Sequence, residues 1–203
     1  LDIKRAYDSV SWDSLACSLR RIRVPEQYIQ LLQNIFEHRT ATVLTAYGYT
    51  DRHHPECGLD QGEVNSPLLW LMFYDPLLTR LRASQYGYEM GRLDGIGSPI
   101  RVGHGAFADD LTLVAENRTK LQKLADVCRS FMKLHDIEVH CGKTVHTAKA
   151  PGGGPARPGL SKIRMADGNS GLVETVHPPT APFRLLGCWM SLDGYNKATF
   201  EIT

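Results

Sequence analysis

Two adjacent carboxylates inside an apolar stretch are the residues of this sequence best suited to chemistry. Asp109 and Asp110 follow Ala106-Phe107-Ala108 and precede Leu111-Thr112-Leu113-Val114-Ala115. Both flanking runs favour β-strands, so the pattern predicts a β-hairpin with the acidic pair at its turn. Such hard oxygen ligands suit Mg²⁺ or Mn²⁺. Taken alone, the stretch is equally compatible with an ordinary exposed turn, where Asp is common.

Asp2 supplies a third carboxylate far upstream, between the apolar residues Leu1 and Ile3. If it ends a central strand beside the hairpin, three carboxylates converge, as two-metal phosphoryl transfer requires. One metal ion then lowers the pKa of the attacking hydroxyl, and the other stabilises the leaving oxygen. For Asp2 alone, a helix cap or a surface acid is the more ordinary interpretation.

Composition and charge are those of an ordinary globular domain. The chain has 203 residues, of which 42% are hydrophobic and 22% charged, enough for one domain with a real core. The net charge of +1 gives no strong nucleic-acid signal for the chain as a whole. Basic residues do cluster locally, at Lys4-Arg5, Arg20-Arg21-Arg23, Arg118-Lys120-Lys123 and Arg157-Lys162-Arg164. On a helix, such clusters are more often solvated faces than phosphate sites.

The cysteines predict the cellular compartment of the chain, and its termini predict that it is part of a longer protein. Five scattered cysteines without a C-x-x-C pair predict a reducing intracellular compartment and argue against a zinc site. We recognise no signal peptide and no apolar run long enough to cross a membrane, so no membrane partner is expected. The chain begins at Leu1 without an initiator Met and stops in a strand-like run, Thr199–Thr203, so we expect a fragment of a longer protein.

Periodicity and capping signals predict a mixture of helices and strands around these acids. Helices are expected over Trp12–Arg21, Pro25–His38, Ser66–Ala83 and Asn117–Leu134, with Ser66 and Asn117 as caps. Strands are expected over Ala41–Ala46, Ile100–Val102, Ala106–Ala115, Ile137–Val139, Val145–Ala148, Lys162–Met165, Leu172–Val176 and Arg184–Met190. A turn is expected at Tyr47-Gly48-Tyr49 and a flexible loop over 150–158. Propensity alone therefore predicts an α+β chain of one domain.

Five segments, in order along the chain, resemble the motifs of reverse transcriptases, most of all those of non-LTR (LINE-type) retroelements. They are Leu1–Val10, Gly58–Gly62 with Ser66–Leu69, Phe107–Asp110, Gly142–Thr144 and Leu185–Cys188. Any one motif is weak, but the ordered set spans nearly the whole chain. The resemblance implies an RNA-directed DNA polymerase, a nucleotidyltransferase whose partners are an RNA template, a DNA primer and deoxynucleoside triphosphates.

The resemblance assigns the three carboxylates to metal binding. Asp2, Asp109 and Asp110 match the catalytic carboxylates that bind two Mg²⁺ ions, for which Mn²⁺ can substitute. The backbone carbonyl of Ile3 matches a further metal contact. Asp8 is not a metal ligand in the family, and we expect it to cap the helix that starts near Trp12 or to accept a structural hydrogen bond.

Residues just after Asp2 match the part of the family site that binds the nucleotide. The backbone amides of Arg5 and Ala6 match positions that hold the triphosphate. Tyr7 matches an aromatic steric gate, whose ring clashes with a 2′-hydroxyl and so selects deoxynucleotides. An aromatic side chain of the core is the alternative role for Tyr7.

Two later motifs also match nucleotide-binding positions. Gln61 matches a glutamine near the nucleotide and the templating base, and Gly62, like Gly58, would let the backbone approach the substrate. Asp60 departs from the pattern, because an acid there weakens attraction for a triphosphate unless a basic neighbour, which the sequence does not identify, compensates. Lys143 matches a lysine beside the pyrophosphate leaving group, where it could act as a general acid or charge stabiliser. An exposed turn lysine is the alternative.

The end of the chain resembles the hairpin that grips the primer strand. Its residues are Leu186, Gly187 and Cys188, followed by the strong turn signal Asp193-Gly194. The resemblance implies an α+β palm, an antiparallel sheet backed by helices, with fingers and thumb largely missing. Residues 1–203 would be the palm with part of the fingers, and 184–203 the start of the primer-grip and thumb junction. We therefore expect the isolated fragment to polymerise weakly or not at all.

Two other interpretations stay open beside an active reverse transcriptase. A degenerate, non-catalytic scaffold of the same fold would still bind nucleic acid, but the intact acids and Tyr7 favour the enzyme. A viral RNA-dependent RNA polymerase palm would share the metal carboxylates. Such a palm normally has an acid at the sugar-selecting position and Gly-Asp-Asp in the third motif, whereas this chain has Tyr7 and Phe107-Ala108 there. No oligomeric state is predicted.

Overall fold

The computed structural model describes residues 1–91, 98–148, 162–166, 171–173, 176–177, 182–186 and 188–191. The chain divides into two units by its internal contacts. The carboxylate unit comprises Leu1–Lys4, Leu77–Leu134 and Glu138–Thr203, and the helical unit comprises Arg5–Pro76 and His135–Ile137. The loop predicted over 150–158, Gly187 and the turn signal Asp193-Gly194 lie outside the described residues.

The helical unit is built on α1 (Trp12–Arg21) and α2 (Glu26–His38), which follow a short 3-10 helix, η1 (Tyr7–Ser9). The helix α3 (Ser66–Ala83) begins in this unit and ends in the carboxylate unit. The predicted limits of the three α-helices are confirmed, except that Pro25 precedes α2 as its N-cap residue. Local signals suffice here because apolar periodicity marks the buried face of each helix.

The helix caps in this unit differ from the prediction. Ser11 caps α1 by accepting an N–H of the first turn at 3.3 Å, so the prediction that Asp8 caps this helix is wrong. Asp8 instead lies in η1, where its backbone carbonyl accepts a hydrogen bond from Cys57 Sγ at 3.3 Å. The Ser66 hydroxyl donates to the Asp60 carbonyl at 2.6 Å and so ties α3 to the preceding loop rather than capping the helix.

The core of the helical unit is aromatic. Trp70 and Phe73 of α3 are fully buried, and the Trp70 ring stacks on Tyr7 at 5.5 Å and on Tyr74 at 5.0 Å between ring centroids. The Ser18 hydroxyl of α1 donates to the Phe73 carbonyl at 3.5 Å. Each large apolar side chain buried here contributes about 1.5–3 kcal/mol. Tertiary packing therefore holds α1 against α3.

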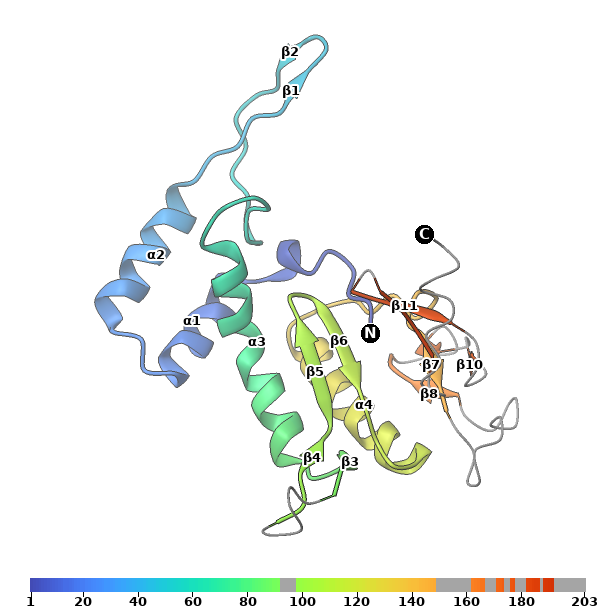
Figure 1. Cartoon of the computed structure of the whole chain (residues 1–203). Coiled ribbons are helices and arrows are strands. Elements are labelled where there is room, and N and C mark those ends of the chain that lie inside the picture. Colours follow the sequence, from blue (N-terminus) through green and yellow to red (C-terminus); the bar gives the residue numbers. More distant parts are fainter. Residues whose placement is uncertain are drawn as a thin grey trace. The chain divides into compact units, whose positions relative to one another are not determined.

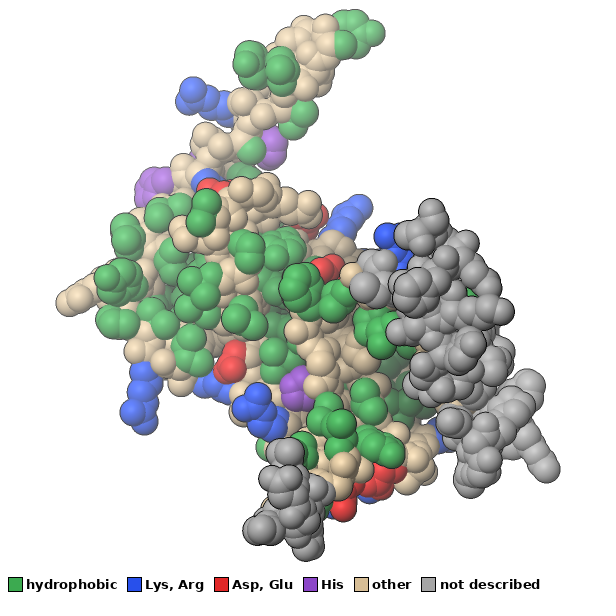
Figure 2. Space-filling model, in the orientation of Figure 1, with side chains coloured by type: hydrophobic (Ala, Val, Ile, Leu, Met, Phe, Trp, Pro, Cys, Tyr) green, Lys and Arg blue, Asp and Glu red, His purple; other side chains and the backbone are tan. Residues whose placement is uncertain are grey.

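A hairpin of β1 (Leu44–Thr45) and β2 (Gly48–Tyr49) follows α2. The turn predicted at Tyr47-Gly48-Tyr49 is wrong, because Gly48 and Tyr49 pair with β1 and the chain turns at Ala46-Tyr47. The hairpin extends away from α2 (Figure 1). Figure 2 shows hydrophobic side chains exposed over α2 and at the tip of the hairpin. Exposed apolar side chains gathered in this way are typical of contact surfaces.

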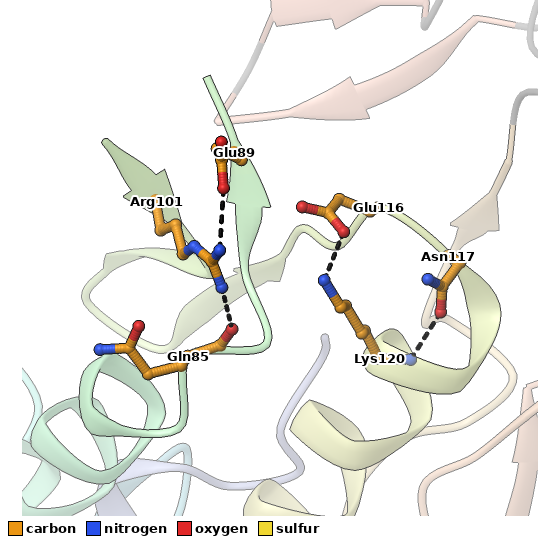
Figure 3. A network of polar contacts seen from close by, with 6 residues as sticks. All are labelled: Gln85, Glu89, Arg101, Glu116, Asn117 and Lys120. Atoms are coloured by element: carbon orange, nitrogen blue, oxygen red, sulfur yellow. Dashed lines mark hydrogen bonds and ion pairs between the residues drawn. The ribbon is translucent and has the colours of Figure 1, made fainter. Parts of the chain in front are cut away.

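The carboxylate unit is organised around the antiparallel pair β5 (His104–Phe107) and β6 (Asp110–Leu113), with Phe107 opposite Asp110. The helix α4 (Arg118–Leu134) contacts β6 and lies behind the pair (Figure 1). Asn117 caps α4 as predicted, because its Oδ1 accepts the Lys120 N–H at 3.0 Å (Figure 3). The cap fixes where α4 begins.

A smaller hairpin, β3 (Tyr88–Glu89) with β4 (Arg101–Val102), joins α3 to β5. The Arg101 guanidinium donates to the Glu89 carboxylate at 2.8 Å and to the Gln85 carbonyl at 3.0 Å (Figure 3). One side chain therefore links both strands of this hairpin to the end of α3.

The remaining strands form short pairs. They are β7 (His146–Thr147), β8 (Ile163–Arg164), β9 (Leu172–Val173), β10 (Val176–His177), β11 (Phe183–Leu185) and β12 (Cys188–Met190). The predicted strand Arg184–Met190 is wrong as one strand, because Leu185 pairs with Cys188 across a hairpin. Within the described residues, β7 and β10 pair in parallel and the other two-stranded sheets are antiparallel. The α+β class is confirmed, with small separate sheets. No helix of the described residues is long and apolar enough to span a membrane.

Candidate active site

The predicted acidic hairpin is present. Its turn is Ala108-Asp109, and Ala108 has a φ of 50°, in the left-handed region that favours glycine. A non-glycine residue there costs on the order of 1–2 kcal/mol, which the flanking strands must offset. The turn leaves Asp109 half-buried and presents Asp110, the first residue of β6, to solvent.

The amino-terminal segment lies beside β6. The Leu1 ammonium donates to the Leu111 carbonyl at 2.7 Å, one residue after Asp110. On its other side the segment pairs with residues near Val139, because the His140 N–H donates to the Asp2 carbonyl at 2.9 Å. Asp2 is thereby held next to the strand that carries Asp110.

The amino-terminal ammonium of Leu1 interacts electrostatically with both Asp2 and Asp110. Burial lowers the pKa of its ammonium, and the negative fields of Asp110 and Asp2 oppose that shift. One cation therefore senses an acid from the hairpin and an acid from the amino-terminal segment. Among the described residues, no group of three His, Cys, Asp or Glu side chains is close enough to hold a metal ion. The donor atoms are of the type that Mg²⁺ prefers, but the described side chains do not form a closed ligand set.

Lys143 lies in a turn that contacts the Asp2 segment. The N–H groups of Lys143 and Thr144 both donate to the His140 carbonyl at 3.0 Å. The Thr144 hydroxyl in turn accepts the Asp2 N–H at 3.3 Å, and the Lys143 side chain is exposed. The first, third and fourth motifs are thus brought together within the carboxylate unit, together with Ile3, which bridges to Val139.

The other predicted nucleotide residues lie in the helical unit. Arg5 adopts a left-handed conformation, with a φ of 47°, and its carbonyl accepts the Ser9 N–H and hydroxyl. Ala6 is buried, whereas Tyr7 is half-buried with its ring stacked on Trp70. Tyr7 is therefore partly a core aromatic, as the alternative interpretation predicted, and part of its surface is accessible.

The second motif pairs with the end of the first motif. The Leu59 N–H donates to the Tyr7 carbonyl and the Gly58 N–H to the Val10 carbonyl, both at 2.8 Å. A Cβ on Gly58 would lie 3.0 Å from Asp8 Cα, so glycine is needed for packing against the chain itself. Gly62, with a φ of 98°, has open space around it, and Gln61 beside it is exposed.

Arg39 is the functional candidate that sequence reasoning missed. Its guanidinium lies 3.5 Å from the Asp60 carboxylate and donates to the Cys57 carbonyl at 2.7 Å. It also stacks over the Phe36 ring at 4.7 Å, which leaves its side chain only 12% exposed. Arg39 is the basic neighbour that offsets Asp60 before Gln61. No local signal marks it, because it lies at the end of α2, in another part of the sequence.

A cavity of about 530 Å³ lies where these two motifs meet. Its charged lining residues are Arg5, Asp8, Glu56 and Asp60. Three carboxylates against one guanidinium do not attract a triphosphate, so this cavity by itself is no triphosphate site. Any phosphate binding near Arg5 must use backbone amides or further cations.

The predicted primer-grip residues follow β11. Leu186 is exposed in a left-handed conformation with a φ of 50°, and the backbone of Cys188 pairs with Leu185. Gly187 lies outside the described residues. The hairpin expected there is present, but its turn falls between Leu185 and Cys188.

The protein family described as reverse transcriptase (RNA-dependent DNA polymerase) matches residues 1–190. This chain belongs to the reverse transcriptase family. The resemblance to non-LTR reverse transcriptases, predicted from five ordered motifs, is confirmed. The Retrovirus-related Pol polyprotein from type-2 retrotransposable element R2DM of Drosophila melanogaster is 32% identical to this reverse transcriptase chain over 144 residues, which are 70% of the chain and 13% of that protein.

Two further relatives are Retrovirus-related Pol polyproteins from type-1 retrotransposable element R2. The protein of Popillia japonica is 27% identical over 203 residues, covering 98% of this reverse transcriptase chain and 27% of the relative. The protein of Nasonia vitripennis is 31% identical over 156 residues, covering 75% of this chain and 14% of the relative. The chain thus spans about a quarter or less of the length of the relatives it matches.

Proposed function

We propose that this reverse transcriptase chain carries the carboxylate centre of an RNA-directed DNA polymerase from a non-LTR retroelement. RNA would be the template, DNA the primer, and deoxynucleoside triphosphates the substrates. The observation that supports this most is the position of Leu1, next to Asp2 in the chain, whose backbone nitrogen lies 2.7 Å from the carbonyl of Leu111, the residue after Asp110. Acids from two distant motifs therefore lie beside one strand.

Asp2, Asp109 and Asp110, with the Ile3 carbonyl, would hold two Mg²⁺ ions, and Mn²⁺ would substitute. When bound, such ions lower the pKa of the primer 3′-hydroxyl and offset the charge on the leaving pyrophosphate. The partly exposed carboxylates of the β5–β6 turn are free of ion pairs with lysine or arginine among the described residues. Catalytic geometry often tightens only in the substrate complex, so the open arrangement is compatible with this role.

Tyr7 would select the sugar, and the backbone amides of Arg5 and Ala6 would bind the triphosphate. The Tyr7 ring is held at 5.5 Å from the buried Trp70 ring, with 24° between their planes. A ring fixed in this way makes a rigid wall, which discriminates against an extra hydroxyl better than a mobile side chain does. Lys143 would protonate or neutralise the leaving pyrophosphate.

The remaining assignments follow the same motifs. Gln61 and Gly62 would contact the nucleotide and the templating base, positioned through the Arg39–Asp60 pair. Leu186, Gly187 and Cys188 would grip the primer. Residues 1–203 would comprise the palm with part of the fingers, and 184–203 the start of the thumb junction. The scattered cysteines support a reducing compartment inside the cell.

Primer extension by the longer protein that contains this chain tests the proposal. Asp109→Asn should lower deoxynucleotide incorporation at least about 10³-fold, because a metal ligand carries several kcal/mol of transition-state stabilisation. Asp13→Asn, the same change in the first turn of α1, should leave synthesis unchanged. The isolated 203-residue chain should extend primers weakly or not at all.

Three results would overturn the assignment. Undiminished synthesis by the Asp109→Asn protein would remove the carboxylates from the mechanism. No synthesis by the longer protein, together with a stability of the chain that Mg²⁺ leaves unchanged, would favour a non-catalytic scaffold. Preference for ribonucleotides would favour an RNA-dependent RNA polymerase instead.

A further inference from the structure

A cavity of about 320 Å³ lies between α4 and the β8–β9 pair, and its lining is strongly basic. The lining residues are Arg118, Gln122, Asp126, Arg129, Lys162, Arg164 and Leu172. The four from α4 recur every three or four residues and so lie along one face of the helix. The others come from a segment some forty residues later in the chain. Members of two basic clusters noted in the sequence, Arg118 from one and Lys162 with Arg164 from the other, thus meet at one cavity.

Hydrogen bonds hold the walls of this cavity together. The Gln122 side-chain amide donates to the Arg164 carbonyl and accepts the Arg164 N–H, each at 2.9 Å. The Arg118 guanidinium donates to the Lys162 carbonyl at 2.9 Å. These bonds use the backbone atoms of residues 162 and 164. The charged side chains of Lys162 and Arg164 can therefore be replaced without breaking the contacts that form the cavity.

The charge of the cavity sets it apart from the rest of the chain. Four cationic side chains line it against one carboxylate, that of Asp126, so its net charge is three positive. The whole chain carries only +1. Asp126 lies 3.4 Å from Arg129, so the one acid of the lining is next to a cation of its own helix. A surface on which cations gather in this way attracts polyanions.

The positive charge of Arg118, one of the lining residues, acts on a neighbouring strand. Burial lowers the pKa of His146 in β7, and the charge of Arg118 lowers it further. The field is thus felt at a buried imidazole, away from full solvent screening.

We propose that this cavity binds phosphate groups of an RNA backbone, as a second nucleic-acid contact besides the carboxylate centre. Guanidinium groups present planar donor pairs that match phosphate oxygens, and a lysine adds a point charge. The volume is at the lower end for ligand pockets, which suits a phosphate and its sugar rather than a large organic ligand. The choice of RNA among polyanions rests on the proposed function. The helix α4 would then contact β6, the strand of the acidic hairpin, and RNA through different residues.

The first test measures RNA binding by the 203-residue chain. A fluorescent single-stranded RNA is titrated at several salt concentrations against the wild type and the Lys162→Gln/Arg164→Gln variant. The variant should bind about tenfold more weakly, and the slope of log Kd against log salt should fall by about one to two. Lys120→Gln/Lys123→Gln removes the same charge from α4 outside the cavity lining, and it should leave the slope unchanged. Equal losses in both variants would overturn the proposal.

The second test locates the contact. The NMR signals of the Gln122 side-chain amide should shift on addition of RNA, and they should shift in the Asp109→Asn variant as well. Undiminished synthesis by the Asp109→Asn protein, with this shift retained, would therefore sink only the proposed function. No shift with RNA, or a shift that inorganic phosphate saturates as readily, would sink the cavity proposal. Circular dichroism of each variant confirms that it is folded.

Discussion

The hairpins β5–β6 and β1–β2 are alike in backbone and opposite in setting. Each is an antiparallel pair that turns through two residues, Ala108-Asp109 in one and Ala46-Tyr47 in the other. Leu111 of β6 is 1% exposed, whereas Leu44 of β1 is 68% exposed. The comparison shows that local sequence is enough to form a hairpin. Where its side chains lie is determined by contacts with the rest of the fold.

The contacts of β6 make the difference. Its Leu111 carbonyl accepts the Leu1 ammonium, and α4 packs against the strand. The first contact joins residues far apart in the sequence and sets the acidic turn beside Asp2, whereas α4 follows β6 closely in the chain and covers it. The β1–β2 hairpin has the apolar tip residues Tyr47 and Tyr49 and no such backing in the described residues of its unit.

The largest expected difference between the hairpins is in stability. Leu111→Ala should lower the free energy of unfolding by about 2–5 kcal/mol, because it leaves a cavity beneath β6. Leu44→Ala should change it by at most about 0.5 kcal/mol. Urea unfolding followed by circular dichroism measures both. Equal losses would mean that β6 is not anchored as described.

A smaller effect is expected where β1–β2 returns to the second motif. Arg39→Ala should destabilise the chain by about 1–2 kcal/mol, since it removes a charged hydrogen bond to Cys57 and the stacking on Phe36. Arg39→Lys should recover only part of the loss, because lysine lacks the planar donor pair. Thermal unfolding of both is compared with that of Arg52→Ala, an exposed site that should be near neutral. If Arg39→Ala lowered the melting temperature no more than that control, the pairing of Arg39 with Asp60 would not stabilise the fold.

The smallest effect is a difference in acid sensitivity. Burial, aided by Arg82, lowers the pKa of His104 at the start of β5. The unfolded chain then binds the proton more readily, so stability is retained above about pH 6.5 and falls as the pH drops below it. His104→Gln should reduce the change in melting temperature between pH 7.5 and 5.5, whereas His53→Gln beside β2 should not. The same acid sensitivity in both variants would contradict this.

Local signals in the sequence were enough for the helices and the acidic hairpin. The limits of α1 and α3, and the Asn117 cap of α4, follow from periodicity and side-chain capping within a few residues. The turn after Phe107 follows from strand propensity on either side. The same kind of signal misplaced the turn predicted at Tyr47-Gly48-Tyr49, because either register of a short hairpin satisfies local preferences.

Contacts between residues far apart in the chain could not be predicted from the sequence. Arg39 and Asp60 are far apart in the chain, and nothing in the local sequence distinguishes Arg39 from the other arginines. The basic clusters on α4 and near Lys162 were visible, but their meeting at one cavity depends on the Gln122 contact with Arg164. The roles of Asp2 and Asp109 came from the ordered motifs, since each acid alone has an ordinary explanation.

Paramagnetic broadening by Mn²⁺ tests the central claim most directly, because it reports which backbone amides lie near one bound cation. In NMR spectra of the 203-residue chain, substoichiometric Mn²⁺ should broaden the amide signals of Asp2, Ile3, Asp109 and Asp110 together. Asp110→Asn should weaken that broadening in both segments, whereas Asp13→Asn should not. Broadening of the β5–β6 turn without any at Asp2 and Ile3 would show that the two motifs share no cation, and would contradict the account.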